Sequence, residues 1–484
     1  MELTALLEGL HRLLPPDSVL TAEEERRTYE CDALPAYRER PAVVVLPRNE
    51  AEVQAVLRQC HRLEVPVVAR GSGTGLSGGA TPHRDGVLLS LARMNRILEL
   101  DPLARTARVE PGVTNLRISE AALPHGLYYA PDPSSQVACS IGGNVAENSG
   151  GVHCLKYGLT VHNVLAVRGY SVSGERLQFG SAALDAPGLD LLALAIGSEG
   201  LLLVVTEVLV RLIARPPCAC VVMASFAQVH SAAAAVAAII GAGIIPAALE
   251  MMDRKATAAV EPFVHAGYDL EAAAILLVES DGTEAEVAHE VARIETLLRA
   301  HGAAALRVAR SAAERQLFWS GRKAAFPAAG RLAPDYYCMD GTIPRKHIGR
   351  ALEAIDAIGE RHGLRCMNVF HAGDGNLHPV ILYDSHEPGS WERAERFGAE
   401  ILELCVALGG TITGEHGVGL EKINSMCMQF TPAERAAFEA VKQAFDPAAL
   451  LNPGKLIPTL ARCAEYGRMH VHGGALPHPQ LPRF

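Results

Sequence analysis

Two short segments in the second half of the sequence concentrate side chains that can bind a metal or carry a proton. HAGDGNLH places His371 and His378 seven residues apart, and GEHGVG adds Glu415 and His416 later in the chain. Neutral imidazoles together with a carboxylate suit zinc and other first-row divalent ions. Two histidines at this spacing are about equally consistent with an ordinary surface loop. The metal hypothesis therefore depends on the elements that position these residues.

Length and charge limit the classes of protein to which the sequence can belong. At 484 residues the chain exceeds one ordinary hydrophobic core, which favours two or three domains. The formal net charge is -10, with mixed signs and no basic run, whereas a phosphate backbone requires a basic surface. We therefore expect no nucleic-acid partner.

The cysteine pattern bears on the redox environment. The 11 cysteines include no CxxC pair, and Cys218 and Cys220 are the most closely spaced. Scattered cysteines in odd number indicate a reducing cytoplasm rather than a disulfide scaffold. Iron–sulfur clusters are usually held by closely spaced cysteines, so we expect none in this chain.

No segment has the pattern of a membrane span or a secretory signal. The amphipathic N-terminus contains Glu2 and Glu8, which excludes a secretory signal. The best candidate for a span, Ala232 to Leu249, is uncharged but Ala-rich and interrupted by Pro246, so a buried helix is favoured. We expect a cytoplasmic protein without a transmembrane segment.

The first ordered region has a strand–helix–strand pattern. Ala42 to Pro47 is an apolar, β-branched run, Asn49 is placed to cap the amphipathic helix that follows, and Val65 to Arg70 is the next strand. Such a unit predicts a parallel pair with a right-handed crossover.

A glycine loop, Arg70 to Gly79, follows that strand directly. Its glycines allow close backbone approach to an anion and include a G-x-G-x-x-G match. A Rossmann domain requires a helix here, but a turn at Asp85-Gly86 and a strand from Val87 to Leu91 follow instead. We therefore reject a dinucleotide-binding Rossmann domain and retain the phosphate loop.

A second loop, Pro131 to Gly158, is dense in Gly, Asn and Ser and has little apolar periodicity. Such a long stretch without regular structure inside a domain is either disordered or functional, and its apolar residues favour the wall of a cofactor site. Beyond a boundary at Arg215 to Pro217, the segments follow a β-α-β-β-α-β order, which predicts a ferredoxin-like second domain from about residue 218.

Several motifs in a consistent order carry a family resemblance. They are PAVVVLP, RGSGTGLSGGA, APDPSSQVACSIGGNVAENSGG, GSEG, HAGDGNLHP, GEHGVG and LNPGK, with YYCMDGTIPR and the tail RCAEYGRMHVHGG. The chain resembles FAD-linked oxidases of the vanillyl-alcohol oxidase (PCMH) type. Within that family it is most similar to the 2-hydroxy-acid dehydrogenase branch, and there to the glycolate oxidase group.

The resemblance implies an α+β fold with a two-lobed, PCMH-type FAD-binding domain and a ferredoxin-like substrate domain. The expected divisions are a helical lead at 1–41, the FAD-binding domain at 42–217, the substrate domain at 218–446, a segment returning to the flavin at 447–458, and a tail at 459–484. Histidines at 470, 472 and 478 in this tail either dock partners or belong to a frayed terminus.

Carried over by position, the resemblance assigns non-covalent FAD to the two glycine loops. The residues are Arg70, Gly71, Ser72, Gly73, Thr74, Gly75, Leu76 and Ser77 for the pyrophosphate, Pro131, Asp132, Ser134, Ser135, Gly142, Asn144, Gly150 and Gly151 for the flavin and its linker, and Glu199, Gly200 and Asn452 to complete the site. Any one of these glycines alone is more often a simple turn residue.

Three departures from the family pattern refine these expectations. Members with covalent flavin often carry His at the position of Thr74, so we expect FAD to be bound without a covalent link. A Gly is usual where this chain has Leu203, so the loop after GSEG is expected to pack differently. Relatives acting on 2-hydroxyglutarate carry a Lys near Cys338, so a substrate with a single carboxylate is expected here.

The resemblance places His371, His378 and Glu415 as ligands of a divalent metal (Zn, Mn or Fe), with His416 as catalytic base and Arg322 as the clamp for the substrate carboxylate. Without the family, Arg322 would be taken for a surface charge on a helix. These roles are chemically consistent with oxidation of a 2-hydroxy acid, because a divalent cation stabilises the alkoxide that develops on the substrate and an imidazole can accept the hydroxyl proton. The expected reaction is FAD-dependent oxidation of glycolate to glyoxylate, and of D-lactate to pyruvate.

Reduced flavin must pass on its electrons, and the resemblance implies a second FAD-type subunit and an iron–sulfur subunit leading to membrane quinone. Such partners would give the chain peripheral contact with the inner face of the membrane. The alternatives are a stand-alone D-lactate dehydrogenase with a cytochrome or quinone acceptor, a non-catalytic flavin subunit, and a metal-dependent hydrolase. The intact histidine set argues against the second alternative, and the long flavin-binding portion argues against the third.

Overall fold

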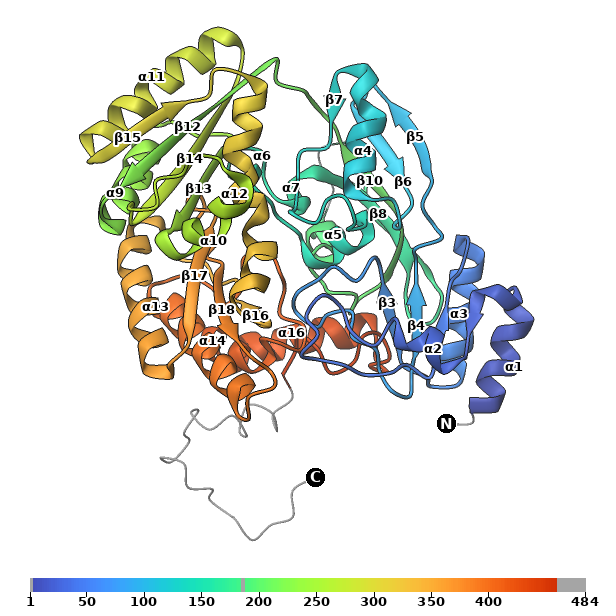
Figure 1. Ribbon diagram of the computed structural model, residues 1–484. Helices are drawn as coiled ribbons and strands as arrows, with labels where there is room; N and C mark the ends of the chain where they lie inside the picture. The colour runs from blue at the N-terminus through green and yellow to red at the C-terminus, as the bar shows by residue number, and fades with distance from the viewer. Residues whose placement is uncertain (1–2, 184–187, 459–484) are drawn as a thin grey trace.

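A computed structural model describes residues 3–183 and 188–458, so the tail histidines lie outside the described residues. The described chain forms two halves that lie side by side, each with its own β-sheets (Figure 1). The mixed helix and strand content confirms the α+β class. No helix within the described ranges is long and apolar enough to cross a membrane.

The first sheet holds the N-terminal glycine loop. Its order is β1 (Val19–Leu20), β2 (Val43–Val45), β4 (Val87–Ser90) and β3 (Val67–Arg70), beside α3 (Glu50–Arg62). The predicted strands β2 and β3 are parallel in direction, but they do not pair with each other because both pair with β4 between them. Asn49 caps α3 as expected, accepting a hydrogen bond from the Glu52 N–H at 3.0 Å.

The second sheet is antiparallel and completes the half that carries the glycine loops. Its order is β5 (Ile97–Asp101), β6 (Thr106–Val109), β10 (Val204–Arg211), β8 (Val164–Tyr170) and β9 (Arg176–Gly180), and β5–β6 and β8–β9 are antiparallel pairs of consecutive strands. The second glycine loop is not structureless, because it contains α5 (Ile141–Glu147) and α6 (Cys154–Tyr157). Glycine-rich helices this short show no apolar periodicity, which explains the wrong expectation.

The third sheet confirms the ferredoxin-like order. It runs β15 (Ala303–Val308), β12 (Cys218–Phe226), β14 (Ala274–Gly282), β13 (Ala248–Asp253), β17 (Arg365–Phe370), β18 (Pro379–Tyr383) and β16 (Asp335–Cys338). The first four strands, with α9 (Val229–Gly241) and α11 (Glu284–Ala300), form the predicted unit. An additional helix, α10 (Arg254–Val264), lies between β13 and β14 in the chain.

The C-terminal segment connects the two halves. Helix α16 (Pro432–Phe445) lies between them at the base of the view in Figure 1. The chain then returns to the first sheet, where the Asn452 N–H donates to the Val67 carbonyl oxygen at 2.8 Å. Hydrogen bonds from the Val418 and Gly419 N–H groups to Glu199 and the ion pair of Lys156 with Asp281 also cross between the halves, so several contacts join them.

Nine cysteines within residues 3–183 and 188–458 are free thiols, in agreement with the scattered pattern.

Candidate active site

A cavity of about 450 Å³ lies between the FAD-binding half and the ferredoxin-like half. One wall consists of the two glycine loops and the 198–200 turn. The opposite wall consists of the histidine cluster and of residues from α12 (Ala312–Leu332) and β16: Lys323, Phe326, Pro327, Tyr336, His378, Glu415 and His416. The glycine loops and the histidine cluster therefore face one another across a single cavity.

Two glycines of the first loop leave no room for a side chain. A Cβ at Gly71 would overlap Ser140 Oγ, and Gly73 combines a φ of +70° with overlap against the Arg70 guanidinium. Arg70 itself is anchored, because Nη1 donates to the Cys31 carbonyl oxygen at 2.7 Å. Backbone N–H groups in such a loop can approach a phosphate closely, so the loop fits a dinucleotide pyrophosphate.

Most of the residues expected to bind cofactor line the cavity. They are Arg70, Gly71, Ser72, Gly73, Thr74, Gly75, Leu76, Ser134, Ser135, Gly142, Asn144, Glu199 and Gly200. The others, Ser77, Pro131, Asp132, Gly150, Gly151 and Asn452, do not line it. Several of these hold the lining loops, since Asn452 Nδ2 donates to the Gly79 and Glu199 carbonyl oxygens at 3.1 and 2.7 Å.

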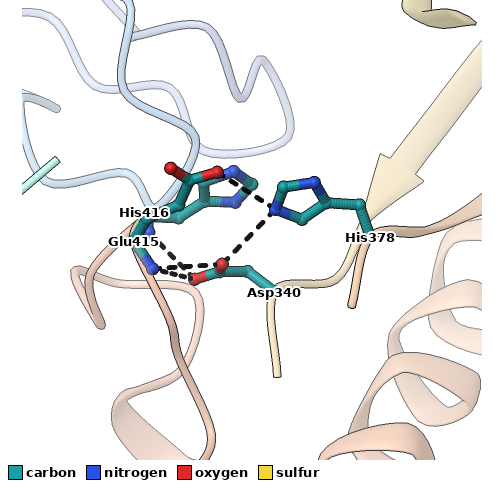
Figure 2. Close-up of side chains that lie close together, drawn as sticks. All are labelled: Asp340, His378, Glu415 and His416. Atoms are coloured by element: carbon teal, nitrogen blue, oxygen red, sulfur yellow. Dashed lines mark hydrogen bonds and ion pairs between the residues drawn. The ribbon is translucent and has the colours of Figure 1, made fainter. Parts of the chain in front are cut away.

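The four predicted metal and base residues come together at one point. Glu415 Oε1 lies 3.3 Å from His371 Nε2 and 3.2 Å from His378 Nε2. His378 and His416 stack with ring centroids 5.1 Å apart. Figure 2 shows His378 facing the carboxylates of both Glu415 and Asp340. The sequence prediction that HAGDGNLH and GEHGVG converge is therefore met in the geometry.

Asp340, which the sequence analysis did not single out, positions the segment that carries Glu415 and His416. Its carboxylate accepts a backbone hydrogen bond from Gly414 at 3.0 Å. It also accepts from the N–H groups of Glu415 at 3.2 Å and His416 at 2.9 Å (Figure 2). Asp340 lies two residues after the end of the short strand β16, and nothing in its local sequence indicates a partner in a segment so far along the chain.

The electrostatics of this cluster are set by burial and by its ion pairs. Burial opposes ionisation of Glu415, but hydrogen bonds from His371 and His378 outweigh it and hold the pKa of Glu415 well below its usual value. The pKa of Asp340 is likewise held well below its usual value, since His416, His378 and Lys422 outweigh burial. Burial lowers the pKa of His416 to about 4. The ionised carboxylates of Glu415 and Asp340 therefore lie beside the neutral imidazole of His416.

These donors fit a divalent cation. Asp340, His378, Glu415 and His416 each offer one ligand atom, and these atoms lie within 4.8 Å of one another. Nδ1 of His378 and Nδ1 of His416 are buried without a hydrogen-bond partner, and His378 Nε2 faces Glu415 Oε1 at 3.2 Å. This geometric group differs from the predicted ligand set by including Asp340 and His416 and omitting His371, although His371 contacts the same Glu415 oxygen.

Arg322 is not the surface charge that its sequence context alone suggests. Its side chain is 3% exposed, and Nε donates to Glu250 Oε2 at 2.7 Å. Its Nη2 is buried without a partner, although Arg322 does not itself line the cavity and the neighbouring Lys323 does. A guanidinium with an unsatisfied N–H group beside the histidine cluster is suited to a carboxylate.

Glu250 is a second residue that the sequence analysis missed. It accepts hydrogen bonds from Arg322 and, through Oε1, from His371 Nδ1 at 2.6 Å. A sequence signal existed, because this glutamate interrupts the apolar strand β13, in which every residue is buried. Because a buried charge in a strand requires a partner, a glutamate at this position predicts an ion pair or a charge-assisted hydrogen bond.

Two family models match the sequence in the same order as the two halves of the fold. Residues 41–180 match "FAD binding domain", and residues 215–456 match "FAD linked oxidases, C-terminal domain". The matched regions contain the glycine loops and the histidine cluster respectively.

The chain is similar over most of its length to named relatives. It is 59% identical to glycolate oxidase subunit GlcD of Escherichia coli (strain K12), covering 99% of this chain and 96% of that protein. It is 38% identical to glycolate oxidase subunit GlcD of Bacillus subtilis, over 94% of this chain and 97% of the relative. It is also 32% identical to a D-lactate dehydrogenase of Archaeoglobus fulgidus, over 86% of this chain and 92% of that protein.

Solved structures share the fold at low identity. A p-cresol methylhydroxylase aligns with a TM-score of 0.79 at 17% identity, covering 95% of this chain and 97% of that chain. A 4-ethylphenol oxidase from Gulosibacter chungangensis aligns with a TM-score of 0.78 at 19% identity, covering 95% and 98%. These neighbours confirm the PCMH-type fold.

Proposed function

Because the chain belongs to the family of FAD-linked oxidases, we propose that it oxidises a short 2-hydroxy acid, with glycolate as the preferred substrate. One observation carries the proposal: a single cavity joins the glycine loops to His378, Glu415 and His416. The 59% identity to a glycolate oxidase subunit supports the choice of substrate. The product from glycolate is glyoxylate.

The glycine loops would hold FAD without a covalent link, with Arg70 to Ser77 around the pyrophosphate. Bound FAD supplies the two-electron acceptor that takes the hydride from C2 of the substrate. Asn452 and Glu199 keep the loops in place, because Asn452 bonds to backbone oxygens of both and Glu199 accepts from the Val418 and Gly419 N–H groups, each at 2.7 Å.

His371, His378 and Glu415 would hold the divalent cation, with Asp340 close enough to join or support them. A bound cation supplies Lewis acidity that lowers the pKa of the substrate hydroxyl. Zinc, manganese and iron(II) all accept this mixture of imidazole and carboxylate donors. Asp340 holds the backbone of Glu415 and His416 whether or not it ligates the cation.

His416 would act as the base and Arg322 as the anchor for the substrate carboxylate. The hydroxyl proton passes to the neutral imidazole of His416, while the C2 hydrogen leaves as hydride, so that the 2-hydroxy acid becomes a 2-oxo acid. The buried Nη2 of Arg322 lacks a partner and can donate to the substrate carboxylate. Electrons and protons balance with one flavin reduced for each substrate oxidised.

We further propose that electrons leave the flavin through a second FAD-type subunit and an iron–sulfur subunit, toward membrane quinone. The similarity to proteins named as subunits supports partners. Within the described residues, the group of side chains that could hold a metal contains no cysteine, so an iron–sulfur relay would come from elsewhere.

A second candidate is a stand-alone D-lactate dehydrogenase. Relatives with that name are 31% and 32% identical to this chain over 92% and 86% of its length. Both activities use the same site, so the distinction lies in the substrate side chain at C2 and in the acceptor.

Anaerobic flavin reduction tests both candidates. The purified protein should show flavin absorbance that bleaches on adding glycolate, more slowly with D-lactate, and not with 2-hydroxyglutarate. Prior treatment with a chelator should abolish bleaching, and added Zn²⁺ or Mn²⁺ should restore it. A protein without flavin absorbance, or a flavin that glycolate and D-lactate leave oxidised, would contradict the proposed oxidation. Faster bleaching by D-lactate would favour the second candidate.

A further inference from the structure

Glu250 occupies a central position between two parts of the candidate site. It lies in β13, is 1% exposed, and is paired across the sheet with Leu277 of β14. Its two carboxylate oxygens have different partners: Oε1 lies 2.6 Å from His371 Nδ1, and Oε2 lies 2.7 Å from Arg322 Nε. His371 directly follows β17, whereas Arg322 belongs to α12, so one side chain connects two elements.

Both contacts are short and involve charged groups in a buried environment. Charge-assisted hydrogen bonds of this length are roughly twice as strong as neutral ones. Each partner is therefore held in one orientation.

The orientation of His371 follows from this contact. A proton on Nδ1 directed at Glu250 leaves Nε2, which faces Glu415 at 3.3 Å, available as a ligand. Carboxylate partners behind ligating histidines select the tautomer in this way.

The orientation of Arg322 follows in the same way. Glu250 occupies Nε, and Nη2 remains buried without a partner. Because the planar guanidinium cannot rotate its N–H groups independently, fixing Nε also fixes the direction in which Nη2 donates.

We propose that Glu250 is a positioning residue that sets the metal ligand His371 and the substrate anchor Arg322 with one carboxylate. Cation affinity and substrate-carboxylate affinity are thereby coupled through this side chain. The inference rests on the proposed function, because it assumes that His371 binds a cation and that Arg322 binds the substrate.

Glu250→Gln is the informative substitution, because a side-chain amide has one acceptor and one donor end. If its oxygen faces Arg322, its NH₂ faces His371 Nδ1, which must then accept, and the proton moves to Nε2. If its oxygen faces His371, its NH₂ meets the Arg322 Nε–H group, donor against donor. In the first orientation His371 loses the tautomer that leaves Nε2 free to ligate, and in the second Arg322 loses its hydrogen bond, so exchange between the two orientations affects both partners.

The test measures each affinity separately on flavin-loaded protein. Zn²⁺ binding is followed by competition with a chromophoric chelator, and glyoxylate binding at saturating Zn²⁺ is followed by the flavin absorbance. We expect Glu250→Gln to weaken Zn²⁺ binding about 10- to 100-fold and glyoxylate binding about tenfold or more, with flavin content unchanged. Arg322→Gln should weaken glyoxylate binding while leaving Zn²⁺ affinity near that of the wild type.

Glu279→Gln is the matched control. Glu279 is also a buried glutamate of this sheet with a histidine partner, contacting His153 Nε2 at 3.4 Å and Trp319 Nε1 at 2.6 Å. It does not line the cavity, and its substitution should leave both affinities at the wild-type level.

The outcomes separate this inference from the proposed function. Wild-type affinities in Glu250→Gln, or loss of only one affinity in both Glu250→Gln and Glu250→Asp, would overturn the coupling while glycolate still bleaches the wild-type flavin. A wild-type protein that neither bleaches nor binds Zn²⁺ refutes the proposed function, and the inference fails with it. If Glu250→Gln does not fold, Glu250→Asp serves instead: its shorter side chain should weaken both affinities, and wild-type values there would also overturn the inference.

Discussion

The imidazole rings of His378 and His416 lie face to face, with centroids 5.1 Å apart and planes inclined by 9°. Burial, followed by the repulsion between the two imidazoles, disfavours a proton on His416 and brings its pKa to about 4, with Asp340 opposing this shift. Burial, with the stacked His378 acting in the same direction, therefore keeps His416 neutral beside the carboxylates, which is the state that a proton acceptor requires.

Replacing His416 should separate proton transfer from cofactor binding. We expect His416→Gln to slow anaerobic flavin reduction by glycolate by roughly 10²- to 10⁴-fold, the range for loss of a general base. FAD content should be unchanged, because His416 is one of many cavity residues. Stopped-flow absorbance measures the rate. His301→Gln, at the end of α11, where Nδ1 contacts the Leu297 carbonyl oxygen, is the control. A wild-type rate in His416→Gln would show that another group takes the proton.

Replacing Asp340 should weaken both the fold and the site. Asp340→Asn replaces one of the two acceptor oxygens by an NH₂ donor, which then faces a backbone N–H group of Glu415 or His416, and removes the negative charge 3.8 Å from buried Lys422. We expect the free energy of unfolding to fall by about 3–5 kcal/mol, as for other broken buried ion pairs, with slower flavin reduction. Urea unfolding measures the first effect.

An exposed aspartate provides the comparison for Asp340. Asp356 pairs with Lys255 at 2.7 Å, and both side chains are 53% exposed. Asp356→Asn should cost less than about 1 kcal/mol and leave flavin reduction unchanged, because exposed ion pairs contribute little. Equal losses in the two variants would argue against a special role for Asp340.

Adding one methyl group in the first glycine loop should expel FAD. In Gly71→Ala the new Cβ would overlap Ser140 Oγ at the start of α5, so the loop must shift away from the position that fits a pyrophosphate. We expect the ratio of flavin to protein absorbance to fall several-fold. Gly330→Ala in α12 meets no atom within 4 Å and should retain full flavin with slightly higher stability. Full flavin in Gly71→Ala would mean that the loop does not contact the cofactor.

FAD should be released when the protein is denatured. Thr74 stands where covalently flavinylated relatives carry His, and Cys139, a free thiol that also lines the cavity, has its pKa raised by burial and is a poor nucleophile. We expect acid precipitation to leave all the yellow colour in the supernatant. Flavin retained in the washed pellet would identify a covalent link.

Asp253 should make stability depend on pH in mild acid. Burial, opposed by hydrogen bonds from Ala256 and Asn368, raises its pKa from 3.8 to about 6 in the folded protein. The folded state therefore holds a proton that the unfolded chain has lost, so this contribution is full below pH 3.8, declines toward pH 6, and is absent above it. The difference is on the order of 2–3 kcal/mol.

Asp253→Asn isolates this term, because Asn does not titrate. The stability advantage of the wild type over the variant should shrink by that amount between pH 4 and pH 6.5, as measured by urea unfolding at each pH. A gap that stays constant, or widens as pH rises, would contradict the raised pKa.

Local sequence patterns were sufficient to predict much of the fold. The cap at Asn49, the strands around the first glycine loop and the β-α-β-β-α-β order were predicted because capping, turns and hydrophobic periodicity act between residues close in sequence. The expectation that the glycine-rich stretch after Pro131 lacks regular structure was wrong for the same reason. Its short helices have no apolar stripe that the sequence could reveal.

The sequence by itself determined which chemical groups are available: the backbone of two glycine loops, and the side chains of the two histidine motifs with their glutamate. Only the tertiary structure decided which side chains position them. Asp340 reaches the backbone of His416, and Glu250 reaches His371, across long separations in the chain. These partners meet because strands of one sheet and the loops after them pack in a particular order. Residue type and local spacing carry no information about that order.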